Sequence, residues 1–138
     1  MSKRLHRIVV VGIVAMLGSI LMLYSDDWFD PEKIRTRNFL PAADYQPDVV
    51  QGEHYYQASC ARCHGGHLKG SAEGPPLLHA TYAPSHHADL SFYHAVKSGV
   101  KQHHWDFGDM PMLTGLNPEQ VSDIISYVRR NQQLAGIQ

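Results

Sequence analysis

The longest apolar run in the chain covers residues 8–24, IVVVGIVAMLGSILMLY, and contains no charged residue. A helix over this run is about 25 Å long at 1.5 Å per residue, close to the thickness of the hydrocarbon core of a bilayer. The acidic segment SDDWFD follows. Tyr24, Trp28 and Phe29 are aromatic and are placed to lie at the membrane interface. The pattern predicts that residues 1–24 form a basic N-terminal segment and one transmembrane anchor.

Three basic residues, Lys3, Arg4 and Arg7, precede the apolar run. Because basic residues favour the cytoplasmic side of a membrane, we expect the N-terminus inside the cell and the rest of the chain outside. Neither a small-x-small cleavage site nor a cysteine for lipid attachment follows the run directly, so the helix is expected to be retained as an anchor. The predicted location is a bacterial inner membrane, spanned once, with the N-terminus cytoplasmic and the main domain periplasmic.

Residues 25–47 mix charged residues with three prolines and show no sustained apolar period. Such a composition is typical of a linker. We expect this linker to be partly docked through Ile34, Phe39 and Leu40. The domain that follows is predicted to cover residues 48–138.

Helical periodicity begins after Asp48, which suits an N-cap. The positions that recur at helical spacing are Val49, Gly52, Tyr56 and then Ser59 or Cys60. They predict a helix of about three turns that ends at the cysteines. A second short helix is expected from Leu90 to about Lys97, capped by Asp89 and closed by Gly99.

The last helix has the clearest signals. Asn117 suits an N-cap, Pro118 suits the first helical position, and Gln120 completes a capping box. An apolar stripe at i, i+3, i+4 and i+7 follows, formed by Val121, Ile124, Ile125 and Val128. Since no segment has a clear strand pattern, the domain is predicted to be all-α.

The chain of 138 residues has 12 Lys and Arg against 13 Asp and Glu, a formal charge of −1 at pH 7. This balance gives no basic surface for nucleic acid. Two long loops, over residues 65–88 and 100–116, are rich in Gly, Pro and His. Loops of this length in a compact domain need something to organise them, and the apolar residues alone supply a thin core. A large apolar prosthetic group would meet both needs.

The chain has two cysteines, Cys60 and Cys63, and His64 directly follows the second in SCARCHGG. A structural zinc site needs four ligands, and there is no second cysteine pair. A redox dithiol would lie at the start of a helix after a strand, whereas this pair lies at the end of a helix. In an exported chain, C-x-x-C-H is typical of covalent haem attachment. Thiols three residues apart can reach both vinyl groups of haem, and His64 then lies under the iron.

From these residues onward, the chain resembles the small class I c-type cytochromes in their membrane-anchored, single-haem form. The resemblance covers about residues 48–132. QGEHYYQASCARCHG resembles the opening helix of the family, with Gly52 and Tyr56 at its glycine and aromatic positions. GPPL, residues 74–77, resembles the Gly-Pro-x-Leu loop, and GDMPMLTGLNPEQVSDIISYVRR resembles the sixth-ligand loop and the last helix.

The resemblance implies an all-α fold: a small class I cytochrome c-like helical domain around a covalent haem, preceded by one N-terminal transmembrane helix. It also implies one covalent haem c, attached at Cys60 and Cys63, with His64 as an axial iron ligand. The backbone carbonyl of Pro75 would accept a hydrogen bond from the other ring nitrogen of His64, which fixes the tautomer. Leu77 would line the haem pocket.

The resemblance assigns the sixth iron ligand to Met110, because it precedes a proline and lies six residues before Leu116. Met112 is an alternative, as are His103 and His104 in the same loop. The choice matters because methionine with histidine raises the reduction potential of haem, whereas two histidines lower it.

The implied function is electron transfer, not enzyme catalysis. One haem c would shuttle single electrons on the outer face of a membrane, between membrane-bound or periplasmic redox proteins of a respiratory or other chain. Two alternatives stay open: a haem-based sensor in which a small ligand displaces Met110, and a cytochrome subunit of a larger oxidoreductase.

Most of the other histidines are expected to be solvated loop residues. The pairs His86–His87 and His103–His104 leave open a copper or zinc site, since imidazole suits both metals. Trp105 and Phe107 are expected to pack against the haem or to cover its loop.

Overall fold

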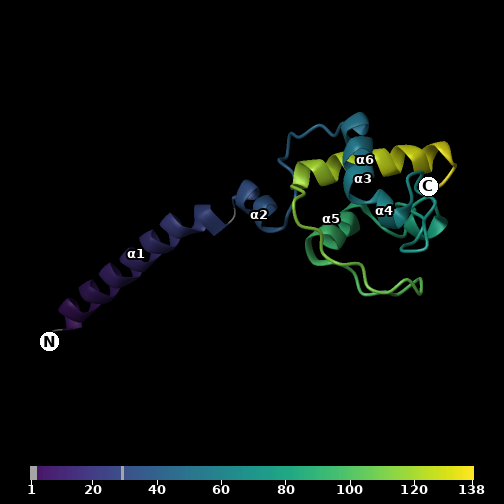
Figure 1. The fold of residues 1–138 in the computed structure, drawn as a ribbon. Coiled ribbons are helices and arrows are strands. Elements are labelled where there is room, and N and C mark those ends of the chain that lie inside the picture. Colours follow the sequence, from purple (N-terminus) through teal and green to yellow (C-terminus); the bar gives the residue numbers. More distant parts are fainter. Residues whose placement is uncertain (1–2, 29) are drawn as a thin grey trace. The chain divides into compact units, whose positions relative to one another are not determined.

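The computed structural model describes residues 3–28 and 30–138 (Figure 1). Within them the regular elements are helices joined by loops, with one isolated β-bridge. The elements in chain order are α1 (Lys3–Trp28), α2 (Pro31–Arg37), α3 (Val49–Ser59), α4 (Ala61–His64), the 3-10 turn η1 (Ala80–Tyr82), α5 (Asp89–Ser98) and α6 (Pro118–Leu134). The chain divides into two units, Met1–Asn38 and Phe39–Gln138. The all-α prediction is confirmed.

Helix α1 is long and apolar enough to cross a membrane over Lys3–Met22, with a mean hydropathy of 2.1. Its side chains are exposed there, as expected for a helix that requires an apolar solvent. This is consistent with a single-pass anchor. The helix is longer than the apolar run, because it takes in the basic cluster and continues to Trp28. The side chains of Tyr24, Trp28 and Phe29 lie outside the part that the structure describes.

Part of the predicted linker forms helix α2. Asp30 is its N-cap and accepts a hydrogen bond from the backbone N–H of Glu32 at 2.9 Å, and Pro31 occupies the first position. The Asp-Pro pair is itself a helix-start signal, although the helix is too short to show an apolar period. Ile34 is exposed.

The compact unit begins at Phe39 rather than at residue 48. Phe39 and Leu40 pack against the cluster of buried residues formed by α5 and α6. Further along, the hydroxyl of Tyr45 donates to the Asp123 carboxylate at 2.9 Å, and the backbone N–H of Asp48 donates to it at 2.8 Å. Asp123 is 3% exposed, so a buried carboxylate of α6 holds this segment in place.

The predicted helix starts are mostly confirmed. Asp48 caps α3, and Asn117 forms the full capping box of α6 with Gln120. The prediction that Asp89 caps α5 is wrong by one position. Ala88 is the N-cap, and Asp89 is the first residue of the helix. The Asp89 carboxylate instead accepts a hydrogen bond from Arg129 Nε of α6 at 2.7 Å.

Helices α3 and α6 pack against each other at the centre of the compact unit (Figure 1). Gly52 permits the close approach, since a Cβ atom there would lie 2.0 Å from the carbonyl oxygen of Asp123. The main buried cluster spans this contact and consists of Tyr56, Leu68, Leu77, Ile124, Tyr127 and Val128. A second cluster consists of Tyr93, Val96, Val121 and Ile125.

Candidate functional site

The C-x-x-C-H residues lie at the junction of two helices. Cys60 ends α3 and precedes α4, which carries Cys63 and His64. The backbone N–H of His64 donates to the Cys60 carbonyl at 2.9 Å. Tyr56 is fully buried one turn earlier, and its hydroxyl donates to the carbonyl of Gly65 at 2.7 Å. This bond links α3 to the residue after the motif, so the turn that carries all three side chains is held at both ends.

The ring of His64 is oriented by one hydrogen bond. Nδ1–H donates to the carbonyl oxygen of Pro75 at 2.9 Å. Because the carbonyl accepts only, Nδ1 holds the proton and Nε2 keeps its lone pair. Burial lowers the pKa of His64, and the bond to Pro75 acts in the opposite direction. A neutral imidazole with an unprotonated Nε2 is the form that binds a metal.

The two thiols are unbridged. Burial raises the pKa of Cys60 to about 12, with a smaller contribution from Cys63. The Cys63 Sγ lies 3.7 Å from Oε2 of Glu73. Cys60 is therefore a protonated thiol against an apolar wall. It lacks the lowered pKa of a redox-active cysteine.

The loop that carries Pro75 and Leu77 is anchored by two polar side chains of α6 that the sequence analysis missed. Gln132 is fully buried, and its Nε2 donates to the carbonyls of Leu77 at 2.8 Å and of Tyr82 at 3.0 Å. Arg129 Nη1 donates to Tyr82 O and to Gln132 Oε1, both at 2.7 Å. Gln132 lies four residues after Val128 and therefore on the same buried face of the helix. A polar residue at such a position is the sequence signal that could have indicated a buried hydrogen bond.

Met110 is held by a different device. Its N–H and C=O pair with those of Val100 at 2.9 Å each, which forms the isolated antiparallel bridge. Gly99, just before the bridge, has φ 73° and ψ 179°, a backbone region that only glycine adopts readily. A Cβ atom at Gly99 would lie 2.5 Å from the Met110 carbonyl oxygen. The close approach of the Val100 and Met110 segments therefore depends on this glycine.

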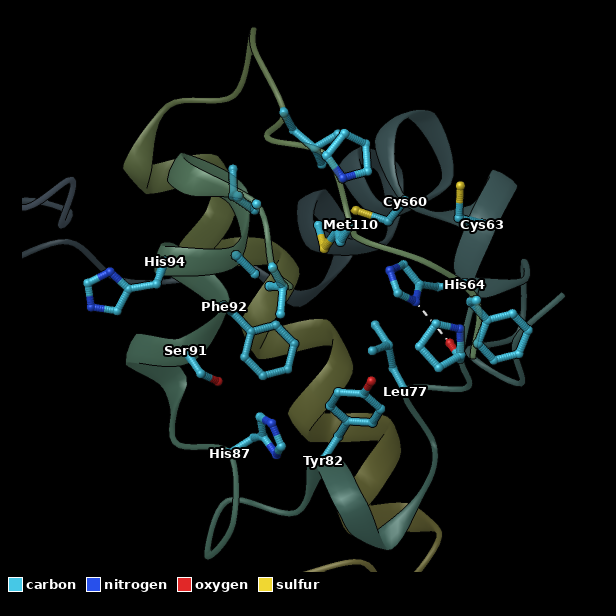
Figure 2. A pocket seen from close by; sticks show the side chains of 18 of the residues that line it. Cys60, Cys63, His64, Leu77, Tyr82, His87, Ser91, Phe92, His94 and Met110 are labelled. Carbon is cyan, nitrogen blue, oxygen red and sulfur yellow. Dashed lines mark hydrogen bonds between the residues drawn. The ribbon is translucent and has the colours of Figure 1, made fainter. Parts of the chain in front are cut away.

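These segments enclose a cavity of about 570 Å³ with a mainly apolar wall. Figure 2 shows Cys60, His64 and Met110 around the same cavity as Leu77 and other side chains. The lining also includes residues of α5, of α6 and of the loop before Met110, namely Phe92, Val96, Val121, Ile124, His103, His104, Trp105 and Phe107. Every predicted haem-binding residue thus lines one cavity, although they come from positions 60 to 110.

The family model for cytochrome c matches residues 49–132, which is more than half of the chain. The chain belongs to the cytochrome c family. No curated protein matches it. Membership identifies a haem-binding electron-transfer protein and implies a covalently bound haem c. It also indicates an electron carrier and not an enzyme.

The cavity of this cytochrome c domain fits haem c in size and chemistry. A volume of about 570 Å³ lies within the range of about 300–1,000 Å³ for ligand sites. Its apolar wall suits a porphyrin, and thiols and an imidazole lie on it. Among the described residues, the buried Nε1 of Trp105 makes no hydrogen bond of ordinary geometry, although the Tyr82 hydroxyl lies near it. A buried indole N–H needs an acceptor, and the propionate groups of haem are acceptors.

The alternative candidates for the sixth iron ligand differ from Met110 in their position and exposure. Met112 is 58% exposed and is not among the residues that line the cavity. His103 and His104 do line it, but both are exposed, and each ring contacts other histidines. Nδ1–H of His103 donates to the Lys101 carbonyl at 2.8 Å.

Proposed function

We propose that this cytochrome holds one haem c through thioether bonds at Cys60 and Cys63, with His64 Nε2 and Met110 Sδ as the axial iron ligands. The proposal rests on the His64–Pro75 hydrogen bond, which leaves Nε2 unprotonated beside a cavity that also contains Met110. When bound, haem supplies a one-electron Fe(III)/Fe(II) couple.

The residues of this chain set the conditions for that couple. Leu77 and Phe92 line the cavity and would help to exclude water from bound haem, and Trp105 Nε1 would be a donor for a propionate. With a histidine and a methionine on the iron, no coordination position is left open for a substrate. This arrangement supports electron transfer over the alternative of a small-ligand sensor.

The anchor confines the cytochrome to a membrane surface. We propose that α1 spans a bacterial inner membrane once, with the basic N-terminus in the cytoplasm and the haem domain in the periplasm. The basic residues before the apolar run support this orientation. Confinement raises the effective concentration near membrane-bound redox partners, and small, transient interfaces are typical of such partners.

Haem attachment is tested on membranes from cells that express the chain. A haem-stained denaturing gel and a pyridine haemochrome spectrum should show one covalent haem per chain. A chain with Cys60→Ala and Cys63→Ala should lose it, because the only thiols are gone. Covalent haem that persists in this variant would contradict the assignment.

The electron-transfer role is tested on the purified holoprotein. At neutral pH the ferrous form should not bind carbon monoxide, because both axial positions are taken. It should still reduce and oxidise reversibly at an electrode. Rapid carbon monoxide binding would instead favour the sensor. Protease added to intact spheroplasts should remove the haem domain if it faces the periplasm.

A further inference from the structure

A group of histidines lies at the edge of the haem cavity, outside the set that holds the haem. His86 and His87 follow η1, and His104 comes from the loop before Met110. Their metal-binding atoms all lie within 4.8 Å of one another. The two segments are 18 positions apart in sequence between His86 and His104, so only the fold brings the three imidazoles together.

The spacing of one pair of these nitrogens matches that of two ligands on a metal ion. His86 Nε2 and His104 Nε2 lie 3.4 Å apart. Two nitrogen ligands about 2.05 Å from a tetrahedral zinc ion are separated by about 3.4 Å. Two neutral imidazoles that meet through these atoms have at most one shared proton between them. The two Nε2 atoms are within hydrogen-bonding distance of each other, and in the tautomers that carry the proton on Nδ1 both Nε2 lone pairs are available to a cation.

His87 is presented to the group by its surroundings. Its Nδ1–H donates to the carbonyl of Thr81 at 2.6 Å, which leaves Nε2 as the ligand atom. The backbone N–H groups of His86 and His87 both donate to the Ala83 carbonyl, at 2.9 Å and 2.8 Å. Arg129 Nη2 donates to the His87 carbonyl. A backbone acceptor behind a histidine is the usual support of a metal ligand.

A fourth imidazole lies beside the group. His103 lies against His104 with ring centroids 4.3 Å apart, and its Nδ1 is also bound to a backbone carbonyl. Four imidazoles therefore lie together, and a metal ion would bind to their unprotonated nitrogens. Imidazole is a good ligand for Zn²⁺ and Cu²⁺.

We propose that His86, His87 and His104 bind one divalent transition-metal ion, Zn²⁺ or Cu²⁺, at the edge of the haem cavity. The ligand chemistry is the same for both ions, with three imidazole nitrogens as ligands. The site rests on the geometry of two loops, and it rests on the proposed function in that Met110 and not His104 is the sixth iron ligand.

The test uses the full-length, haem-loaded protein in detergent, purified without a polyhistidine tag and stripped with a chelator. Calorimetric titration with Zn²⁺, and separately with Cu²⁺, should show one saturable site. The variant with His86→Ala and His104→Ala should bind at least about 100-fold more weakly, since it loses two of the three ligands. Both side chains are exposed, so the variant should keep its fold and its haem.

The control is His67→Ala, which removes an exposed histidine outside the group and should leave the affinity unchanged. Electron paramagnetic resonance of the Cu²⁺-loaded protein should show couplings to several nitrogens, and these should be reduced in the double variant. The proposal is overturned if the unmodified protein has no saturable site, or if the double variant binds as tightly as the His67→Ala protein.

Discussion

The two sides of the haem cavity are built in different ways. On the attachment side, Cys60, Cys63 and His64 follow α3, which packs against α6 through Gly52 and is linked to the motif by the buried Tyr56. Met110 also lines the cavity, but it lies in a loop whose nearest support is a two-bond bridge to Val100.

Because of this difference, we expect substitutions on the two sides to have different consequences. The attachment side depends on helix packing, so damage there should unfold the domain. The Met110 side depends on a glycine and a bridge, so changes there should alter iron ligation while haem stays attached. Substitutions on the two sides test this contrast.

Gly52→Ala should have the largest effect on stability. The new methyl group would lie 2.0 Å from the Asp123 carbonyl oxygen, which belongs to the α6 backbone and cannot move alone. We expect a loss of about 3 kcal/mol in the free energy of unfolding, measured by denaturant titration of the holoprotein. Gly66→Ala is the control, because its nearest neighbour is the flexible Gln57 side chain at 3.4 Å. Equal stability of the two variants would show that the helices do not pack this closely.

Met110→His should lower the midpoint potential by on the order of 0.1 V, within the range of about 0.8 V that axial ligands set. This corresponds to about 2 kcal/mol for one electron. Covalent haem should be retained, as a stained gel would show. Met112→His is the matched control and should not change the potential, since Met112 is exposed and outside the cavity. If Met112→His shifts the potential and Met110→His does not, the sixth-ligand assignment is wrong.

Gly99→Ala should weaken Met110 ligation without loss of haem. It combines a backbone conformation that disfavours alanine with a contact of 2.5 Å to the Met110 carbonyl. We expect a cost of about 2 kcal/mol and a weaker red-region absorption band of the methionine–iron bond. Gly108→Ala separates backbone strain from steric contact. Gly108 has φ 89°, so alanine would be strained there, but no atom lies within 4 Å of an added Cβ. If both variants keep the band at full strength, the bridge does not position Met110.

Tyr45→Phe should have the smallest effect, about 1 kcal/mol, because it removes a half-buried hydrogen bond to Asp123. Burial and the Asp123 carboxylate raise the pKa of Tyr45 to about 12 from 10. The unfolded chain therefore ionises first, and the stabilisation that is present below pH 10 is lost as the pH rises towards 12. The free energy of unfolding, measured by denaturant titration at pH 8 and at pH 11, should fall less between these pH values in the variant than in the unmodified protein. An identical fall would mean that Tyr45 does not contribute.

Local signals predicted the helices and the attachment turn well. The capping box at Asn117 and the N-cap at Asp48 are each complete within a few residues, and the structure contains both. The segment before residue 48 was less predictable. Helix α2 has only seven residues, too few for a period, and the docking of Tyr45 depends on Asp123, 78 positions away.

The attachment motif, the apolar N-terminal helix and the main helices could be read from local sequence, because each depends on residues that are adjacent or one turn apart. Only the tertiary structure placed Met110 on the cavity wall with Met112 outside it. It alone brought Arg129 to Asp89 across 40 positions and assembled His86, His87 and His104. These arrangements depend on how α5, α6 and two long loops pack, and contacts between distant residues leave no periodic signal along a single chain.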